Sequence, residues 1–285
     1  MRIFLGIIII LIVFSSIAYG SDSDKPPLFF QPLIQRLSLD GFEVEFLSKL
    51  LTDPRAEVIP AVLTISLDPR ENPERYKKFL SPESILISKK FLLQNLTILK
   101  KMEGRFQVEK EVVVAILLVE SRFGENIGKY RVIPTLAGMA LIDSPENLQK
   151  NYQILREIDP ELSYEWIEAL AKRKAKWAYH ELKCFLEIIC NEKIDPLEVW
   201  GSSAGALGMA QFIPSSYLTY ALNKKSFKHW LLSKEDAINS IGNYLKSHGW
   251  KRNLSTEKKK QLIWHYNRSK PYIETVLQVA QKIKH

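Results

Sequence analysis

The chain has 285 residues, of which 46% are hydrophobic and 25% are charged, and its formal net charge is +8. This is the composition of an ordinary soluble globular protein, and the length suits one domain with an extension. The two cysteines have no matching Cys or His cluster, which excludes a cysteine-rich metal site. The positive charge favours polyanionic partners, which for an exported chain are cell-wall polymers or membrane surfaces rather than nucleic acid.

The first twenty residues are typical of a secretory signal peptide. Met1 and Arg2 give a positively charged start, and residues 3–14 form an apolar core. Residues 18–20 have small side chains at their first and last positions, a pattern suited to cleavage. The apolar core is short for a membrane span, although an uncleaved anchor that tethers the chain to a membrane stays open. No Cys lies near the cleavage point, so no lipid anchor is expected. We therefore expect a periplasmic or secreted protein.

Residues 21–104 are predicted to form an N-terminal helical extension. Residues 34–51 carry apolar side chains at roughly helical spacing and predict one helix. The stretch from there to Pro82 holds five prolines and predicts an irregular arm with short helical turns. Ser81 as N-cap and Pro82 as the first helical residue predict the start of a further helix, which we expect to stop near Gly104.

Between residues 112 and 124, in VVVAILLVESRFG, eight apolar residues run straight into a carboxylate. Periodicity does not distinguish a buried helix from a buried strand here, but Glu109 and Glu111 at one end and Gly124 at the other favour a helix. Glu120 then lies in its last turn. A carboxyl group held against apolar surroundings has a raised pKa and can act as an acid near neutral pH. A structural glutamate, paired with a nearby Arg or Lys, is the alternative.

The next segment is predicted to be helical with interruptions at prolines, and residues 161–189 are strongly helix-forming. The interruptions are expected at Pro134, Pro145 and Pro160. Cys184 and Cys190 lie six residues apart in the long helix, which separates them by about 9 Å of rise and disfavours a disulfide. We favour two buried thiols, although an oxidising compartment leaves a disulfide open.

Residues 200–217, WGSSAGALGMAQFIPSSY, contain three glycines that let the backbone approach a ligand closely. Pro214 is expected to begin a helix. Phosphate binding is disfavoured, because no strand precedes the glycines and no Lys-Ser or Lys-Thr follows them. Residues 234–250 and 272–283 predict two more helices, so the expected fold is all-α with little or no β structure.

An ordinary glycosidase needs two carboxyl groups flanking the bond that it cleaves. Only Glu120 qualifies here: Glu125 lies past the predicted helix end, Asp143 lacks an apolar setting, and Asp195 is expected to cap a turn before Pro196. A single buried acid suits a reaction in which the substrate supplies its own nucleophile. The acid first protonates the leaving oxygen and then serves as the base.

Four motifs in order, VESRFG, GSSAGALGMAQFIPSSY, AINSIGNYLKSHGW and YNRSKPY, resemble the lytic murein transglycosylase B family of peptidoglycan-cleaving enzymes. The match spans roughly residues 105–283. The resemblance implies a lysozyme-like catalytic domain over residues 105–285, peptidoglycan glycan strands as the partner, no cofactor and a monomer. It also implies cleavage between N-acetylmuramic acid and N-acetylglucosamine without water, in which the muramyl 6-hydroxyl closes on C1 to leave a 1,6-anhydro sugar.

The resemblance makes Glu120 the sole catalytic acid and base. Amide and hydroxyl groups can hold sugar hydroxyl and acetamido groups, and aromatic faces can pack on sugar rings. For Phe212 and Tyr272, simple core packing is the alternative. The positions that match the substrate-binding residues of the family are Ser202, Gln211, Phe212, Tyr266, Asn267 and Tyr272.

The chain departs from the family pattern in two places. In the family an Arg-Arg pair commonly follows the catalytic Glu by about 25 residues. Its best match here is Arg173 and Lys174, 53 residues after Glu120, which implies a helical insertion at about residues 144–171. Lys174 cannot bind a carboxylate in the bidentate manner of an arginine, and Arg173 is the weakest of the expected substrate-binding residues. The metal-binding loop of longer members is replaced by residues 221–232, which hold no carboxylate, so we expect no calcium site.

Two other functions remain open on the sequence. A hydrolytic muramidase would use the same fold and the same Glu120 but would release a reducing sugar. A catalytically inactive peptidoglycan-binding protein would keep the substrate-binding residues without the reaction. It is disfavoured because Glu120, Gln211 and Asn267 are all present.

Overall fold

The computed structural model describes residues 27–68, 72–190, 192, 194–224 and 226–284. The predicted signal peptide over residues 1–20, and with it the question of an uncleaved anchor, lies outside the described residues. Among the residues described, no helix combines the length and the apolar character needed to cross a membrane.

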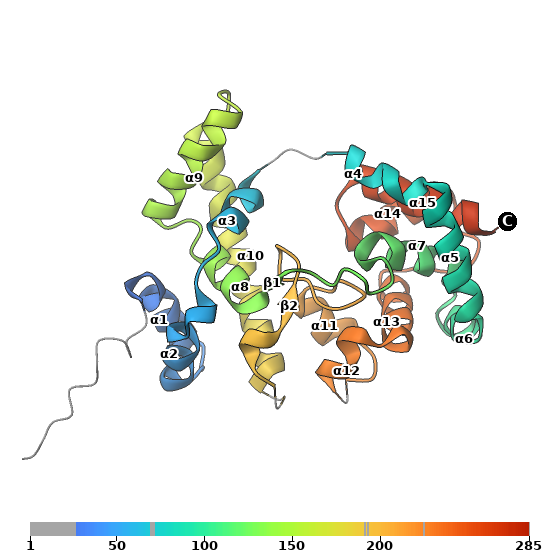
Figure 1. The fold of residues 1–285 in the computed structure, drawn as a ribbon, viewed down its shortest axis with the longest axis horizontal. Helices are drawn as coiled ribbons and strands as arrows, with labels where there is room; N and C mark the ends of the chain where they lie inside the picture. The colour runs from blue at the N-terminus through green and yellow to red at the C-terminus, as the bar shows by residue number, and fades with distance from the viewer. Residues whose placement is uncertain (1–26, 69–71, 191, 193, 225, 285) are drawn as a thin grey trace, which may run out of the picture.

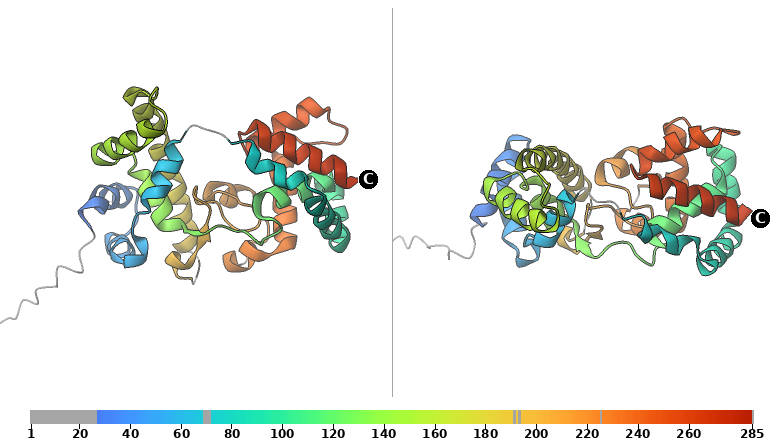
Figure 2. Two further views of the ribbon diagram at one scale, coloured as in Figure 1. Left: turned by 45° about the horizontal axis from the view of Figure 1, so that its top comes forward. Right: turned by 90° about the horizontal axis from the view of Figure 1, so that it is seen from above.

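The helices gather in two lobes that lie side by side (Figures 1 and 2). The first lobe holds α1 (Gln31–Leu39), α2 (Val44–Thr52), α3 (Pro60–Leu67), α8 (Val132–Ala140), α9 (Pro145–Ile158) and α10 (Tyr164–Cys190). The second lobe holds α4 (Glu74–Lys77), α5 (Pro82–Gln94), α6 (Leu96–Phe106), α7 (Lys110–Ser121), α13 (Lys234–Ser247), α14 (Thr256–Tyr266) and α15 (Lys270–Lys284). Between them lie α11 (Pro214–Tyr220), which contacts both α10 and α13, and α12 (Phe227–Leu232).

Four short 3-10 helices complete the helical elements described: η2 (Leu28–Phe30), η3 (Pro54–Ala56), η4 (Lys78–Leu80) and η5 (Pro196–Glu198). The described β structure in named strands is one antiparallel pair, β1 (Tyr130–Arg131) and β2 (Trp200–Gly201), with Tyr130 opposite Gly201. The sheet lies between the lobes (Figure 1). The prediction of an all-α chain with little β structure is confirmed.

A close backbone approach holds this small sheet together. Gly128 has a φ of +112°, and a Cβ atom at this position would lie 2.0 Å from the carbonyl carbon of Gly201. No side chain fits in that space, and a φ in this range is strained for any L residue with a Cβ. Gly128 therefore sets how closely the turn before β1 lies against β2.

The centre of the second lobe is α7, whose residues from Val112 to Leu118 are all buried. It packs against α5, α13 and α15. The apolar run is a helix rather than a strand, as predicted, and Glu120 lies in its last turn. Since α7 is surrounded by other helices, the position of its C-terminal end is fixed by packing on several sides.

The helix predicted over residues 34–51 is wrong, because the chain forms two helices there. α1 ends at Leu39, and α2 begins only at Val44. Gly41 lies between them with a φ of +96°, a left-handed conformation that is incompatible with a continuous helix and that glycine adopts readily. The apolar spacing alone did not show this break.

The predicted helix start at Ser81 and Pro82 is confirmed, and the Ser81 hydroxyl accepts a hydrogen bond from the Ser84 N–H at 3.2 Å. The predicted stop near Gly104 lies within two residues of the end of α6 at Phe106, but the prediction of a single continuous helix is wrong. α5 ends at Gln94, Asn95 leaves the helical conformation, and α6 then continues through Gly104 to Phe106. The irregular, proline-rich arm before Pro82 contains one full helix, α3, beside its short turns.

Pro134 does not interrupt a helix, contrary to the prediction. It occupies the third position of α8, where a backbone N–H has no intrahelical partner to lose. Both cysteines are free thiols on the unbroken α10. Cys184 is buried but Cys190 is exposed, so the prediction of two buried thiols is correct only for Cys184.

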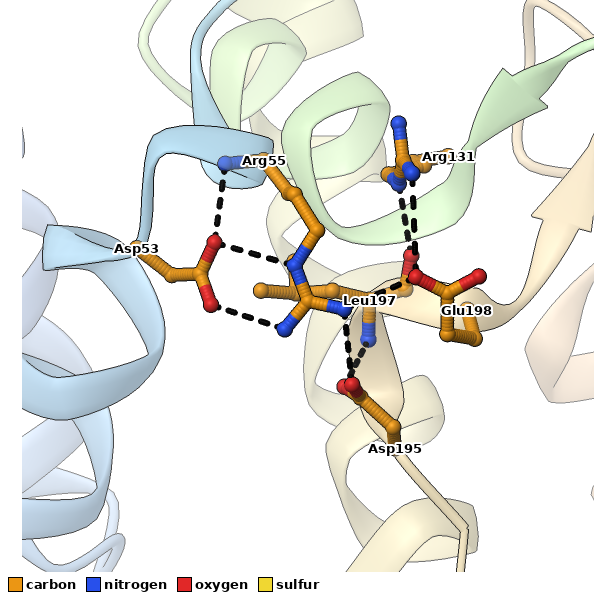
Figure 3. Close-up of polar contacts among 6 residues, drawn as sticks. All are labelled: Asp53, Arg55, Arg131, Asp195, Leu197 and Glu198. Carbon is orange, nitrogen blue, oxygen red and sulfur yellow. Dashed lines mark hydrogen bonds and ion pairs between the residues drawn. The ribbon is translucent and has the colours of Figure 1, made fainter.

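An ion-pair network joins the N-terminal part of the chain to the segment that leads into β2 (Figure 3). The Arg55 guanidinium donates to Asp53 at 2.8 and 3.0 Å, to Asp195 at 2.7 Å and to Glu198 at 2.8 Å. Arg131 of β1 donates to the carbonyl oxygen of Leu197 at 2.8 Å. The Arg55 guanidinium lowers the pKa of the Asp53 carboxyl to about 2. Asp195 also accepts from the N–H of Leu197, so its predicted capping role is confirmed.

Candidate active site

Glu120 is placed by the way in which α7 ends. The three residues that follow Ser121 all have left-handed backbones, with φ of 49° at Arg122, 63° at Phe123 and 95° at Gly124. The Ser121 hydroxyl donates to the Met209 carbonyl oxygen at 2.8 Å and accepts from the Gly124 N–H at 3.0 Å. The last turn of α7 is therefore tied directly to the glycine-rich segment over residues 200–217.

Tyr272 of α15 supplies the hydrogen-bond partner of Glu120. Its hydroxyl donates to Glu120 Oε1 at 2.6 Å, and its side chain is buried. Burial raises the pKa of Glu120 to about 7, because the charged carboxylate loses its hydration, while the bond from Tyr272 acts in the opposite direction. The pKa of Tyr272 lies well above its usual value, because the ring is buried beside Glu120. Tyr272 thus stays a donor, and Glu120 can hold a proton at neutral pH.

Tyr266 and Asn267 end α14 near the same place. The Tyr266 hydroxyl donates to the Ala210 carbonyl oxygen at 2.5 Å, and Asn267 is the half-buried C-cap residue. Burial, and then the neighbouring charge of Glu120, raise the pKa of Tyr266 well above its usual value. The contact with Ala210 brings the end of α14 onto the glycine-rich segment, as Ser121 does for the end of α7.

Gln211 and Ser202 shape the glycine-rich segment from within. The Gln211 side-chain nitrogen donates to the carbonyl oxygens of Ile127 at 3.1 Å and Gly208 at 2.9 Å. The Ser202 hydroxyl accepts from the N–H groups of Ala204 and Ala206, both at 3.1 Å. The Gln211 amide oxygen and the Ser202 hydroxyl proton take no part in these four bonds.

Phe212 lies inside an aromatic cluster. Only 2% of its surface is exposed, and its ring centroid lies 5.6 to 5.9 Å from those of Trp230, Tyr244 and Tyr266. Its position is therefore beneath Tyr266, within the packed core of the segment. Tyr272 is equally buried, but its hydroxyl reaches Glu120.

Arg173 is exposed on α10, and none of the contacts found within the described part of the chain joins it to Glu120 or to the glycine-rich segment. Its neighbour Lys174 is half-buried, and burial followed by the charge of Arg173 lowers the pKa of the Lys174 ammonium. Six of the eight predicted site residues thus lie in one connected region. The seventh, Asn267, adjoins this region as the neighbour of Tyr266, and the eighth, Arg173, lies apart from it in the first lobe.

A buried carboxylate fixes the end of the glycine-rich segment. Glu181 of α10 is only 2% exposed and accepts from both the N–H and the hydroxyl of Ser215, at 2.9 and 2.8 Å. Ser215 is the second residue of α11. Burying a carboxylate is costly unless it is hydrogen-bonded, so these two bonds join α10 to α11 at a defined point. Sequence reasoning missed this residue, which reads as one more glutamate on an amphipathic helix.

Tyr76 was also missed. It comes from α4, in the proline-rich arm, and its ring packs edge-on against Tyr272 with centroids 6.3 Å apart. Nothing in the local sequence distinguishes Tyr76 from other tyrosines, since its role depends on where the arm lies on α15. The arm therefore contributes directly to the surroundings of the Glu120–Tyr272 pair.

The carboxylates that sequence reasoning set aside as structural have other partners. Glu125 pairs with Arg122 at 2.8 Å, and Asp195 pairs with Arg55. Asn223, in the segment that replaces the metal-binding loop, donates to Asp236 at 2.8 Å. Within the residues that the structure describes, no group of three or more His, Cys, Asp or Glu side chains is placed to hold a metal ion.

The arrangement provides one carboxyl group with a raised pKa, a tyrosine hydroxyl that donates to one of its oxygens, and amide and hydroxyl groups on the glycine-rich segment. A carboxyl with a pKa near 7 can both donate and accept a proton near neutral pH, which is what a group used in two successive proton transfers requires.

Comparison with known proteins shows the family to which this chain belongs. The family model described as a transglycosylase SLT domain matches residues 29–261. Membrane-bound lytic murein transglycosylase B of Escherichia coli (strain K12) is 31% identical over 245 residues, which are 81% of this chain but only 60% of that relative.

Solved structures have the same fold. The Escherichia coli lytic transglycosylase Slt35 in complex with bulgecin A superposes with a TM-score of 0.71 at 23% identity, over 93% of this chain and 95% of that one. The soluble lytic transglycosylase SltB1 of Pseudomonas aeruginosa gives 0.68 at 24% identity, over 90% and 98%. SltB3 of Pseudomonas aeruginosa, in complex with NAG-NAM-pentapeptide, gives 0.68 at 20% identity, over 90% and 79%. The lysozyme-like fold expected from the sequence is confirmed, and the chain belongs to the family of SLT-domain transglycosylases.

Proposed function

We propose that this protein is a lytic transglycosylase that cleaves the bond between N-acetylmuramic acid and N-acetylglucosamine in peptidoglycan, with Glu120 as its single acid and base. The carboxyl group of Glu120, with a pKa of about 7 and Tyr272 as its hydrogen-bond partner, is the observation that carries the proposal. Membership of the transglycosylase family and the names of the relatives support the class of reaction.

The proposed reaction balances without water. Protonated Glu120 gives its proton to the glycosidic oxygen, and the bond from C1 to that oxygen breaks. The resulting Glu120 carboxylate then takes the proton of the muramyl 6-hydroxyl as this oxygen bonds to C1. The products are a 1,6-anhydro-muramyl end and a free 4-hydroxyl end, and Glu120 regains its proton.

The other site residues are proposed to hold the glycan strand. The Gln211 amide oxygen and the Ser202 hydroxyl proton are free of the bonds described above and suit acetamido and hydroxyl groups of sugars. Asn267 would add an amide beside Tyr266. We propose that Phe212 acts by supporting Tyr266 from within the aromatic cluster. A contact of Arg173 with the strand remains a prediction.

Replacing Glu120 tests the proposal. Glu120→Gln keeps the shape of the side chain but cannot transfer the proton, so digestion of purified sacculi should fall by about 10²- to 10⁴-fold. Glu125→Gln, an exposed glutamate five residues further on, is the matched control and should digest sacculi as wild type does.

Mass spectrometry of the wild-type products separates the two possible reactions, because an anhydro end is lighter than a reducing end by one water. Products with reducing muramic ends alone would make the protein a hydrolytic muramidase. Equal digestion by wild type and Glu120→Gln would remove Glu120 from the mechanism, and absence of digestion by wild type would favour a peptidoglycan-binding protein.

The setting of the reaction is part of the proposal. Export through residues 1–20 would place the protein in the periplasm or outside the cell, where peptidoglycan lies. The proposal also keeps the division of the chain that the motif resemblance implies. It consists of an extension over residues 21–104 and a catalytic domain over residues 105–285, with an insertion at about 144–171.

A further inference from the structure

The outer side of α14 and α15 contains a pocket that the proposed reaction does not use. Its volume is about 470 Å³, within the range of small-ligand sites. Trp264 forms part of its wall and has 40% of its surface exposed. We call it the α14–α15 pocket, and its lining residues are Lys260, Gln261, Trp264, Lys270, Ile273 and Glu274.

This pocket faces away from Glu120. Residues two apart on an α-helix point about 200° apart, because each residue turns the helix by about 100°. Trp264 is two residues from Tyr266 on α14, and Lys270 and Glu274 are each two residues from Tyr272 on α15. Since Tyr272 points toward Glu120, the α14–α15 pocket lies on the opposite side of the helix that bears it.

The same part of the chain carries most of the net charge. Residues 251–285 contain nine Lys or Arg and two Glu, a net charge of +7 out of +8 for the whole chain. Lys259 and Lys260 pair with glutamates. The remaining seven basic side chains form no ion pair within the described residues, Lys270 at the pocket among them. At the pocket itself Lys270 is the cation without an ion pair among the lining residues, and it suits a ligand with negative charge.

The lining residues combine the groups that bind sugars. The exposed indole of Trp264 offers a flat apolar face, and the Gln261 side-chain nitrogen offers a donor, while the Gln261 amide oxygen accepts from the Lys258 ammonium at 3.1 Å. The Lys260 ammonium pairs with Glu274 at 2.9 Å and with Glu257 at 3.3 Å. The Lys270 ammonium has no ion-pair partner in the described part of the chain and can bind a carboxylate of the ligand.

We propose that the α14–α15 pocket is a second binding site for peptidoglycan, holding an N-acetylated sugar against Trp264 and a carboxylate of the strand or its peptide at Lys270. The proposal rests on the proposed function for its ligand. Sacculi present many strands at once, so two weak sites on one molecule give stronger retention than either site alone. The pocket would hold the enzyme on the wall while the strand at Glu120 is exchanged.

Co-sedimentation with purified sacculi tests this site. All variants carry Glu120→Gln, so the wall stays intact during the measurement. Trp264→Ala should weaken binding to sacculi by about fivefold, as expected for loss of an aromatic anchor. The matched control is Trp166→Ala, because Trp166 is 41% exposed but lies on α10 in the first lobe. It should bind as the parent does. Lys270→Glu, a change at the surface, should weaken binding without removing any part of the core.

Three outcomes would overturn the second site. Trp264→Ala and Lys270→Glu could both bind sacculi as tightly as Trp166→Ala does. Lys270→Glu could by itself bind sacculi as tightly as the parent does, which would exclude a carboxylate bound at Lys270. The Trp264 effect could also appear only with vesicles containing anionic phospholipid, which would make the surface a membrane contact.

Activity on a soluble muropeptide, measured with Glu120 intact, separates this site from the reaction itself. Trp264→Ala should leave that activity unchanged, because a soluble fragment needs no second point of attachment. If wild type gives no anhydro products, the proposed function fails, but the comparison of Trp264→Ala with Trp166→Ala on sacculi still decides whether the pocket binds the wall.

Discussion

At the scale of single residues, the pair of Glu120 and Tyr272 sets the pH range in which the proposed enzyme should work. Glu120 must carry a proton to begin the reaction, and the pKa of its carboxyl group is raised to about 7. The proton is therefore present below this value and lost above it. We expect kcat/KM on soluble muropeptides to fall as the pH rises through about 7.

Removing the tyrosine hydroxyl should change the pH at which kcat/KM falls. The bond from Tyr272 favours the charged form of Glu120 and so lowers its pKa. Tyr272→Phe should therefore lower the maximal rate but shift the fall of kcat/KM to higher pH. Tyr266→Phe is the control, because the Tyr266 hydroxyl bonds to a backbone carbonyl instead of Glu120. If kcat/KM of Tyr272→Phe falls at the same pH as in wild type, or at a lower pH, this account is contradicted.

Part of this pair could be predicted from the sequence. The apolar run before Glu120 predicted the direction of its pKa shift, since that shift follows from the buried neighbours along the helix, although the Glu120 side chain itself is half-buried. The motif resemblance named Tyr272 as well. That Tyr272 is the partner of Glu120 could not be predicted, because the two are 152 residues apart and meet only through the packing of α15 on α7.

Other residues show the limit of the same reasoning. An aromatic residue in a sequence does not reveal which side of the backbone it faces, so Phe212 was expected along the substrate but lies among three aromatic rings. Glu181 and Tyr76 gave no local signal, because their contacts with Ser215 and Tyr272 are set by tertiary packing.

At the scale of elements, the two-stranded sheet depends on the absence of one side chain. Gly128→Ala would place a methyl group within 2.0 Å of the Gly201 backbone, at a φ of +112°. The turn must shift, and with it the start of the glycine-rich segment. We expect a loss of unfolding free energy of roughly 2–4 kcal/mol and a clear drop in activity on sacculi, measured by denaturant unfolding and turbidity clearing.

Gly104→Ala is the matched control for that substitution. Gly104 lies inside α6, and a Cβ atom added there would meet nothing within 4 Å. Because alanine favours a helix over glycine, the change should raise the free energy of unfolding by up to about 1 kcal/mol and leave activity unchanged. If Gly128→Ala were as stable as Gly104→Ala, the close approach at Gly201 would not be a constraint.

The helices that could be predicted are those whose ends carry a local signal. Ser81 and Pro82 begin α5 as expected, and Gly249, with a φ of +102°, follows the end of α13. The break at Gly41 and the early end of α5 at Gln94 were missed, since a glycine or an asparagine within an apolar pattern can be accommodated either way. Packing against the rest of the molecule decides such cases.

At the scale of the whole molecule, the N-terminal extension is shared between the two lobes. α1 to α3 lie with α8 to α10, while α4 to α6 lie with α7, α13 and α15 (Figure 1). The sequence predicted helices in this extension but not their distribution, because no pattern along the chain states which distant helix a given face will meet. The extension thus contributes both to the support of β2 and, through Tyr76, to the surroundings of Glu120.

Arg55 provides a test of that long-range support. It joins η3 to Asp195 and Glu198, more than 130 residues away, just before β2. Arg55→Met should increase hydrogen exchange over residues 195–201, because the three carboxylates lose their shared partner. The pairs are exposed, so the melting temperature should fall by only about 1–3 °C.

Lys172→Met is the control for Arg55→Met, since it removes a single exposed ion pair with Glu168 within α10. It should leave hydrogen exchange over residues 195–201 unchanged. Equal exchange in the two variants would mean that the network around Arg55 does not hold the segment before β2.

The bond between Tyr272 and Glu120 also bears on when the protein can become active. Glu120 lies well before the middle of the chain, whereas its partner is part of the last helix described. During synthesis α7 leaves the ribosome long before α15, so the carboxyl group meets its partner only when folding is nearly complete. The proposed acid and its hydrogen-bond partner are in this way kept apart until α15 has been made and has packed on α7.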